Sequence, residues 1–205
     1  KIGDDKLTWT FKINDKAKFS NGNKVTAEAV KSSLERVFAK SNRAKTFFEY
    51  SEISADGQNL IIKTAKPVPS LPGMLADPLF IVIDTSVKDR DYAKQGPICT
   101  GPYVVKEYSK AKAVMEANPN YWDGEVPFKH VEIPTIDDPN TRAMALQSGE
   151  IDMAINIAAG DLSLFNKKDK FNISEIASLR TVLAQINMNE GRPLHDIRVR
   201  EALIS

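Results

Sequence analysis

Hydrophobic and polar residues alternate near the start of the chain, over residues 9–13. Trp9, Phe11 and Ile13 point to one side, and Thr10 and Lys12 point to the other. A period of two is typical of a β-strand that buries one of its faces. The pattern therefore predicts a strand whose aromatic side faces a core.

A helix is predicted after this strand, beyond a tight turn. Asn21-Gly22 is a strong turn dipeptide, and Thr26 has the short hydroxyl side chain that caps helix N-termini. After Thr26, hydrophobic residues recur every three or four positions, which places them on one helical face: Val30, Leu34, Val37 and Phe38. This spacing predicts a helix over residues 27–39.

Turn and strand signals divide the middle of the chain. Asp56-Gly57 lies between two β-rich runs, residues 51–55 and 59–64, and this arrangement predicts a β-hairpin. Leu79–Ile83 is a continuous apolar run of strand length, which predicts a strand buried on both faces. Gly96-Pro97 interrupts regular structure, so we expect a domain or lobe boundary there.

The second half of the chain mixes short strands with helices. Asp138 precedes a proline at the first helical position, and Gly149 ends the helical pattern that follows. The other predicted elements are strands over residues 103–108, 113–117 and 131–136, around Ile151, Met153 and Ile155, and over 181–188, with short helices over 162–165 and from about Asp196. The mixture predicts a chain built from both strands and helices.

The composition is that of an ordinary folded protein. Hydrophobic residues make up 42% and charged residues 27% of the 205 positions, which excludes disorder. A net charge of +1 gives no electrostatic argument for nucleic acid or an anionic membrane surface. The apolar runs are far shorter than the ~20 residues that cross a bilayer. Because the chain starts at Lys1 and stops within a helical pattern, we expect it to be a piece of a larger protein.

Residues that carry catalytic chemistry are few and isolated. His130 and His195 lack a partner at metal-ligand spacing, and Cys99 lies in a loop without a close basic neighbour in the sequence. Phosphate-binding loops, nucleophile elbows and dinucleotide fingerprints are absent from the sequence. We therefore predict no catalytic residue, no metal site and no cofactor. A binding module is favoured over a hydrolase-type enzyme or a purely structural or adhesive module.

Three stretches of the chain resemble one family, the extracellular solute-binding proteins of peptide and nickel ABC transporters (family 5). The stretches are residues 9–30, with Phe19-Ser20-Asn21-Gly22 and Thr26-Ala27, residues 100–152, with Thr100-Gly101-Pro102-Tyr103 and Asn118-Pro119-Asn120-Tyr121-Trp122, and residues 187–203. Their order and spacing match the family over most of the chain. One departure is Cys99, where members commonly have glycine.

The resemblance implies an α/β fold of the type II periplasmic-binding-protein class, in which two lobes close over a ligand by hinge motion. The chain then corresponds mostly to lobe one. Residues 1–95 resemble the extra subdomain of lobe one, and residues 96–180 resemble its main part. Residues 181–205 resemble the hinge strand and the truncated start of lobe two.

The resemblance also implies a function, namely the substrate-binding component of an ABC importer. Such a protein captures short peptides outside the cytoplasmic membrane, in the periplasm or as a lipid-anchored protein at the cell surface. It delivers them to the permease subunits of the transporter, with peripheral membrane association and no nucleic-acid partner. The alternative within the family is a receptor for nickel or a nickel chelate. Peptide is preferred because residues 78–84 lack the ligand-facing arginine that nickel-type receptors place in this region.

Ligand contacts are expected from lobe one and from the hinge strand. The candidates are the loop around Phe47, Phe48 and Tyr50, the segment near Phe80, and the hinge residues Asn187 and Asn189. Core packing explains Phe47 or Phe48 equally well, since one of these two neighbours must point inward. The sequence leaves the ligand open between peptide and nickel chelate, and we expect this chain on its own to fold without binding solute strongly.

Overall fold

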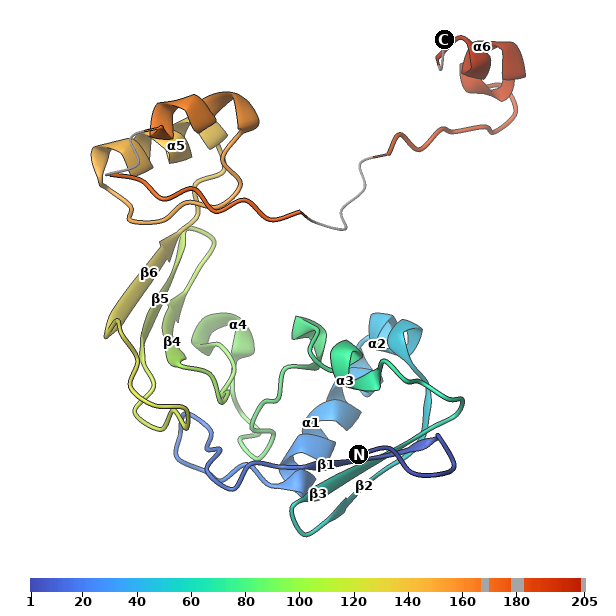
Figure 1. Cartoon of the computed structure of the whole chain (residues 1–205), viewed down its shortest axis with the longest axis vertical. Helices are drawn as coiled ribbons and strands as arrows, with labels where there is room; N and C mark the ends of the chain where they lie inside the picture. Colours follow the sequence, from blue (N-terminus) through green and yellow to red (C-terminus); the bar gives the residue numbers. More distant parts are fainter. Residues whose placement is uncertain (167–169, 178–182, 204–205) are drawn as a thin grey trace. The chain divides into compact units, whose positions relative to one another are not determined.

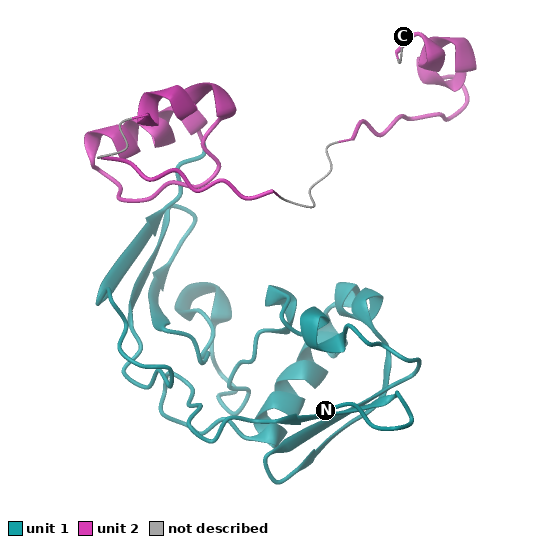
Figure 2. Cartoon of the chain, in the orientation of Figure 1, with its two compact units in different colours: residues 1–137 teal, residues 138–205 magenta. Residues whose placement is uncertain are grey.

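The computed structural model describes residues 1–166, 170–177 and 183–203. The chain divides into two compact units, residues 1–137 and residues 138–205 (Figure 2). Both strands and helices occur in this chain, as the prediction of a mixed α/β fold requires. This division reflects contacts within the chain and does not test the subdomain and lobe limits predicted near residues 95 and 180. Those limits remain predictions.

The first unit contains an antiparallel sheet in the order β1-β3-β2 (Figure 1). Its strands are β1 (Thr8–Lys12), β2 (Tyr50–Asp56) and β3 (Asn59–Thr64). β3 is central and pairs Trp9 with Ile62 on one side and Ile53 with Ile62 on the other. The strand predicted at residues 9–13 and the hairpin around Asp56-Gly57 are both confirmed.

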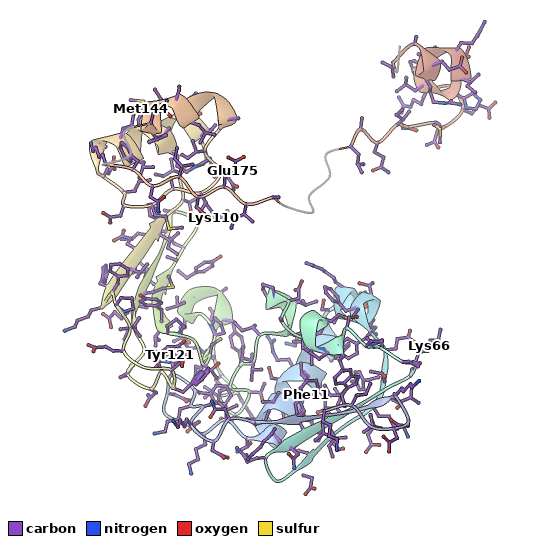
Figure 3. All side chains as sticks on the ribbon, in the orientation of Figure 1. Phe11, Lys66, Lys110, Tyr121, Met144 and Glu175 are labelled. Atoms are coloured by element: carbon purple, nitrogen blue, oxygen red, sulfur yellow. The ribbon has the colours of Figure 1, made fainter. Side chains whose placement is uncertain are left out.

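Helix α1 (Ala27–Lys40) packs against this sheet and forms the main core. The Thr26 hydroxyl accepts a hydrogen bond from the Ala29 amide at 3.1 Å, which caps the helix as predicted. Figure 3 shows side chains filling the layer where Phe11 lies. The buried hydrophobic residues of this core are Phe19, Val25, Ala27, Val30, Leu34, Val37, Phe38, Ala44, Phe48, Ile53, Leu60, Ile62, Leu71, Phe80 and Ile98.

In place of the strand predicted at Leu79–Ile83, the chain has one 3₁₀ turn that ends at Phe80, and residues 81–83 form no helix or strand. Helix α2 (Asn42–Phe47) follows α1, and then come α3 (Leu71–Met74), the 3₁₀ helix η1 (Pro78–Phe80) and α4 (Tyr92–Gln95). The prediction of a strand buried on both faces is wrong.

The reason lies in the backbone partners of the segment. Pro78 has no N–H to donate to a ladder, and the Asp77 side chain accepts from the Leu79 amide at 2.8 Å, which starts a helical turn. Further on, the Ile83 amide donates to Ser33 Oγ on α1 at 3.0 Å. Ile81 is 51% exposed, so the run is not buried on both sides.

A second antiparallel sheet completes the first unit, in the order β4-β5-β6. Its strands are β4 (Tyr103–Tyr108), β5 (Lys112–Ala117) and β6 (His130–Pro134), which confirms the strands predicted in these regions. One face carries ion pairs between neighbouring strands, Lys106 with Glu116 and Lys112 with Glu132, each at 3.1 Å. Such exposed pairs contribute little to stability and mark this face as solvated.

The second unit begins with helix α5 (Pro139–Ser148). Asp138 caps it by accepting from the Thr141 amide at 2.7 Å, and Gly149 ends it with a φ of +81°, as the sequence predicts. The remaining elements are the 3₁₀ helices η2 (Ala159–Phe165) and η3 (Pro193–His195) and helix α6 (Ile197–Glu201). The short helix predicted at residues 162–165 and the element predicted from Asp196 are confirmed.

Two strands predicted in this unit are not strands in its described residues. The amides of Glu150 and Ile151 both donate to the Ala145 carbonyl, which extends the end of α5 and starts a loop. Met153 is 77% exposed, and Asn156 has a φ of +56°, so the alternating residues do not line a ladder. Residues 183–188 form no strand either, and residues 181–182 of that prediction lie outside the described residues.

Candidate functional site

Four of the six predicted ligand contacts come together around Phe38, which α1 supplies. Phe38 lies edge-on to Phe48 and Tyr50, with ring centroids 5.1 and 4.7 Å apart. Phe80 lies 5.8 Å from Phe38 and 5.7 Å from Phe48, and Phe47 meets Phe80 edge-on at 5.4 Å. We call these five residues the aromatic cluster. Such contacts are favourable beyond the hydrophobic burial itself.

The members of the aromatic cluster differ in exposure. Phe48 and Phe80 are buried, with 4% and 3% of their surface exposed, while Phe47 and Tyr50 are half-buried. The expectation that one of Phe47 and Phe48 points inward is confirmed, and the inward residue is Phe48. Only Phe47 and Tyr50 among the four candidates therefore present appreciable surface beyond the core.

A positively charged side chain, that of Arg43, lies at the outer side of the aromatic cluster. The Arg43 guanidinium sits 5.6 Å from the centre of the Phe47 ring, within cation–π range. It also approaches the Asp77 carboxylate at 3.7 Å. An aromatic ring, a guanidinium and a carboxylate therefore lie next to one another here, from Phe47, Arg43 and Asp77.

Asp84, four residues after Phe80 in the chain, carries a buried carboxylate. Asp84 Oδ2 accepts hydrogen bonds from the side-chain amides of Asn21 and Asn23, each at 2.8 Å. Asp84 Oδ1 accepts from the Ser86 amide at 2.9 Å and from the Ser86 hydroxyl at 2.6 Å. We call these four residues the joint. Burial acts to raise the pKa of Asp84, but the hydrogen bonds from Ser86, Asn21 and Asn23 outweigh it and lower that pKa to about 2.

The joint connects distant parts of the first unit. The Ser20 amide donates to the Cys99 carbonyl at 2.8 Å, and the Asn120 side-chain amide donates to the Ser20 carbonyl at 3.2 Å. The turn that carries Asn21 therefore contacts the chain on both sides of β4 and β5. The joint was not predicted from the sequence. Its only signal there is the position of Asp84 at the end of an apolar run.

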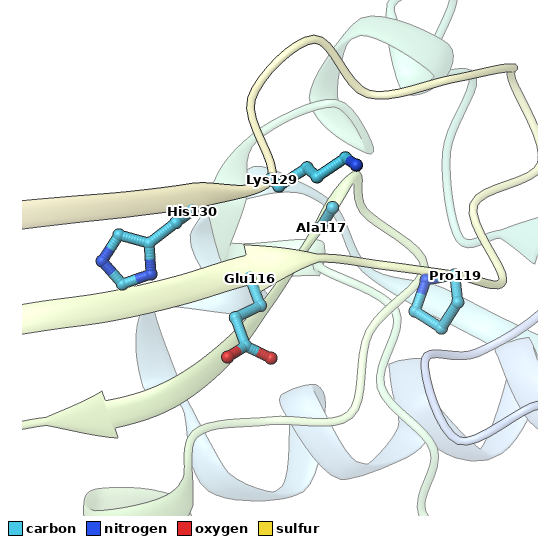
Figure 4. Close-up of a pocket in the computed structure, with 5 residues that line it drawn as sticks. All are labelled: Glu116, Ala117, Pro119, Lys129 and His130. Carbon is cyan, nitrogen blue, oxygen red and sulfur yellow. The ribbon is translucent and has the colours of Figure 1, made fainter.

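A shallow pocket lies where β5 ends and β6 begins, beside the loop that joins them (Figure 4). It is lined by Glu116, Ala117, Pro119, Lys129 and His130. Glu116 and His130 are cross-strand neighbours, and Figure 4 shows the Lys129 side chain directed away from the Glu116 carboxylate. Glu116 already forms an ion pair with Lys106. The charged side chains that line the pocket therefore do not converge on one position where a ligand could bind.

The other two predicted contacts lie in the second unit. Asn187 and Asn189 are exposed, and Asn187 Oδ1 accepts a hydrogen bond from the Asn189 amide at 3.1 Å. A hollow runs along residues 185–189, with Gln185 and Met188 beside them. The amide side chains of Gln185, Asn187 and Asn189 line this hollow.

Nucleophilic and metal-binding groups do not assemble in the described residues. Burial raises the pKa of the Cys99 thiol to about 11, against an opposing effect of Arg90. His130 and His195 are exposed, and His195 Nδ1 lies 2.9 Å from the Met188 carbonyl. Residues 1–166, 170–177 and 183–203 hold no group of three or more metal-ligating side chains. The helices in these ranges also include none with the length and apolar character needed to span a membrane.

The family model of the bacterial extracellular solute-binding proteins, family 5 (middle region), matches residues 1–204. The chain belongs to this family. Members of family 5 are receptors of the type II periplasmic binding fold, so the resemblance found in the sequence motifs is confirmed.

The relatives of this chain include proteins named for nickel binding and proteins named for peptide binding. The nickel-binding protein NikA of Staphylococcus aureus is 33% identical over 197 residues, covering 96% of this chain and 39% of that protein. Its crystal structure with Ni(L-His)2 has a TM-score of 0.68 and 36% identity over 72% of this chain and 32% of that chain. The probable D,D-dipeptide-binding protein DdpA of Escherichia coli K12 is 30% identical over 213 residues, covering 99% of this chain and 41% of that protein.

A second solved structure has a higher TM-score against this chain. The nickel ABC transporter protein of Bacillus halodurans has a TM-score of 0.75 and 30% identity, covering 82% of this chain and 35% of that chain. The chain spans about two fifths of the length of its curated relatives.

Proposed function

We propose that this chain is part of the substrate-binding component of an ABC importer. The observation that carries the proposal is the family 5 match, which extends over residues 1–204. The mixed α/β fold and its similarity to two solved family 5 receptors support the same function. The protein then acts outside the cytoplasmic membrane, in the periplasm or lipid-anchored at the cell surface, and hands its solute to the permease subunits. Its role is binding rather than catalysis.

The proposed ligand contacts are those with exposed surface. Phe47 and Tyr50 offer aromatic edges, and Asn187 and Asn189 offer side-chain amides. Phe48 and Phe80 are predicted contacts that lie within the core, so their proposed part is to hold Phe47 and Tyr50 in place through the ring contacts of the aromatic cluster.

A short peptide is the proposed ligand. Side-chain amides such as those of Gln185, Asn187 and Asn189 match the donors and acceptors of a peptide backbone. Recognition through the backbone, directly or through water, tolerates varied side chains. The segment at residues 78–84 carries no arginine to hold an anionic chelate. The E. coli relative is named as a probable dipeptide-binding protein, which is consistent with this proposal.

A nickel chelate is the second candidate. The observation in its favour is the similarity to the nickel-binding NikA of S. aureus, whose crystal structure contains nickel with two histidine molecules. A metal that arrives already complexed needs few ligands from the protein. Aromatic surface at Phe47 and Tyr50 would suit the rings of such a complex as well as it suits a peptide.

Calorimetric titration of the full-length protein that contains this chain tests both candidates. One titration uses a mixture of short peptides, and the other uses nickel with histidine. Saturable heat with peptides and none with nickel–histidine is the expected result. Heat with nickel–histidine alone would replace peptide by the second candidate, and no heat with either would overturn the proposed function.

A further inference from the structure

The Asn21-Gly22 dipeptide has a chemical reactivity that is independent of solute binding. In such a pair, the glycine amide nitrogen attacks the asparagine Cγ and forms a C–N bond. The Cγ–Nδ2 bond breaks, and ammonia leaves with the proton from the glycine amide. Water then opens the resulting succinimide ring and yields aspartate or isoaspartate. Glycine favours this reaction because it has no side chain to obstruct the approach and its backbone is adaptable.

The folded chain holds both reacting groups away from this reaction. The Gly22 amide donates to the Phe19 carbonyl at 2.9 Å, so its proton is engaged and the nitrogen is a poorer nucleophile. The Asn21 side chain is fixed at both ends, because Nδ2 donates to Asp84 Oδ2 at 2.8 Å and Oδ1 accepts from the Asn23 amide at 3.1 Å.

Charge acts in the same direction. Attack on Cγ places negative charge on the side chain of Asn21, whose Nδ2 lies 2.8 Å from Oδ2 of the buried Asp84 carboxylate. Like charges at this distance raise the energy of the intermediate. Burial does not protect the pair, because Asn21 and Gly22 are both exposed to the water that completes the reaction.

We propose that Asn21 is a deamidation site that the joint locks in the folded chain, and that its conversion prevents the joint from closing again. The product carries a carboxylate where Asn21 Nδ2 donated to Asp84 Oδ2. The donor is lost, and two carboxylates face each other in a partly buried place, which is unfavourable unless one takes up a proton. An opening of the joint that lasts long enough for reaction therefore becomes permanent.

The first test measures the locking. The chain is incubated folded and in urea at the same pH and temperature, and the peptide containing Asn21 is followed by mass spectrometry. We expect deamidation to be at least about tenfold slower in the folded chain, because reaction requires a local opening. Equal rates in the two states would overturn the proposal.

A matched internal control comes from the exposed loop that carries Asp123 and Gly124. The D123N variant creates a second Asn-Gly pair there, where nothing lies within 4 Å of the position of a Cβ on Gly124. In the folded variant we expect position 123 to deamidate at least about tenfold faster than Asn21. Adding Ser86→Ala, which removes a donor to Asp84, should speed the reaction at Asn21 and leave position 123 unchanged. An unchanged rate at Asn21 would show that the joint is not the lock.

The second test measures the consequence of conversion. N21D imitates the product, and N14D is its control, because Asn14 Oδ1 only accepts from the Lys16 amide and a carboxylate does the same. We expect N21D to unfold at clearly lower urea concentration than the wild type and N14D to match the wild type. An N21D chain as stable as N14D would contradict the claim that conversion keeps the joint open. Neither test involves a solute, so failure here leaves the importer proposal untouched.

Discussion

Gly96 and Val105 approach each other so closely that no larger residue fits at position 96. A Cβ on Gly96 would lie 2.9 Å from the Cβ of Val105 in β4, which is closer than real Cβ contacts occur. Gly96 also has a φ of +64° and a ψ of 172°, a combination that essentially only glycine adopts. The contact fixes the end of α4 against the second sheet.

Replacing Gly96 by alanine should therefore destabilise the first unit for two reasons. The backbone conformation costs about 1–3 kcal/mol in a residue with a Cβ, and overpacking against Val105 adds about 1–3 kcal/mol. We expect a loss of about 2–6 kcal/mol in the free energy of unfolding, measured by urea denaturation.

Gly149→Ala is the control for the backbone part alone. Gly149 has a φ of +81° and a ψ of 17°, and nothing lies within 4 Å of its Cβ position. This variant should lose only about 1–2 kcal/mol. Equal losses in the two variants would show that the contact with Val105 carries no cost.

Asp84 should make the stability of the chain sensitive to acid. Its pKa lies at about 2 in the folded chain, below the ordinary value of 3.8, so the folded state holds the charged form more strongly than the unfolded state does. The stabilisation is complete above about pH 4 and is lost as the pH falls toward 2. D84N should lose about 1–3 kcal/mol at neutral pH and show a smaller further loss between pH 4 and 2.

The exposed Asp89 provides a comparison for this pH profile. D89N should keep the acid-dependent loss of the wild type, measured as the urea midpoint at each pH. A D84N profile that runs parallel to the wild type would contradict the role of the Asp84 charge.

Cys99 should react slowly with thiol reagents in the folded chain. Burial raises its pKa to about 11, against an opposing effect of Arg90, whereas the ordinary value is 9.0. The reactive thiolate is then on the order of a hundredfold scarcer at pH 8 than in the unfolded chain. A chromogenic disulfide such as DTNB measures both rates. Reaction at the same rate with and without urea would show that the thiol is neither buried nor perturbed.

Local sequence signals predicted the elements whose partners lie nearby in the chain. The cap at Thr26 and the turn at Asp56-Gly57 act within a few residues, and both elements were predicted correctly. The segment Leu79–Ile83 differs, because its backbone is satisfied by Ser33, fifty residues away, and not by a neighbouring strand. Hydrophobicity alone could not reveal that partner.

The candidate site was predictable to a smaller extent. The neighbouring aromatics Phe47 and Phe48 predicted that one side chain would be buried, but only the end of α2 decides that it is Phe48. The joint could not be predicted, because Asn21 and Asp84 are 63 residues apart and meet only once the first unit has folded. Polar pairs of this kind leave no periodic pattern in a sequence.

Asn189 is expected to contribute to ligand binding in the full-length protein. Removal of its amide in N189A should weaken the binding of solute by about 0.5–1.5 kcal/mol, the usual contribution of one hydrogen bond. N172A, at another exposed asparagine of the second unit, should bind like the wild type. Calorimetry on both variants compares them, and an unchanged affinity for N189A would remove Asn189 from the site.

We propose that this chain supplies only part of the enclosure around an imported solute. A receptor that closes around its ligand gains affinity by excluding water from both sides, and this chain spans about two fifths of its curated relatives. Paired titrations of the full-length protein and of this 205-residue chain, with the same peptides and with nickel–histidine, test the claim directly. We predict saturable binding to the full-length protein and at least about a hundredfold weaker binding to the chain alone. Comparable affinity in the two, or no binding by the full-length protein, would contradict the account.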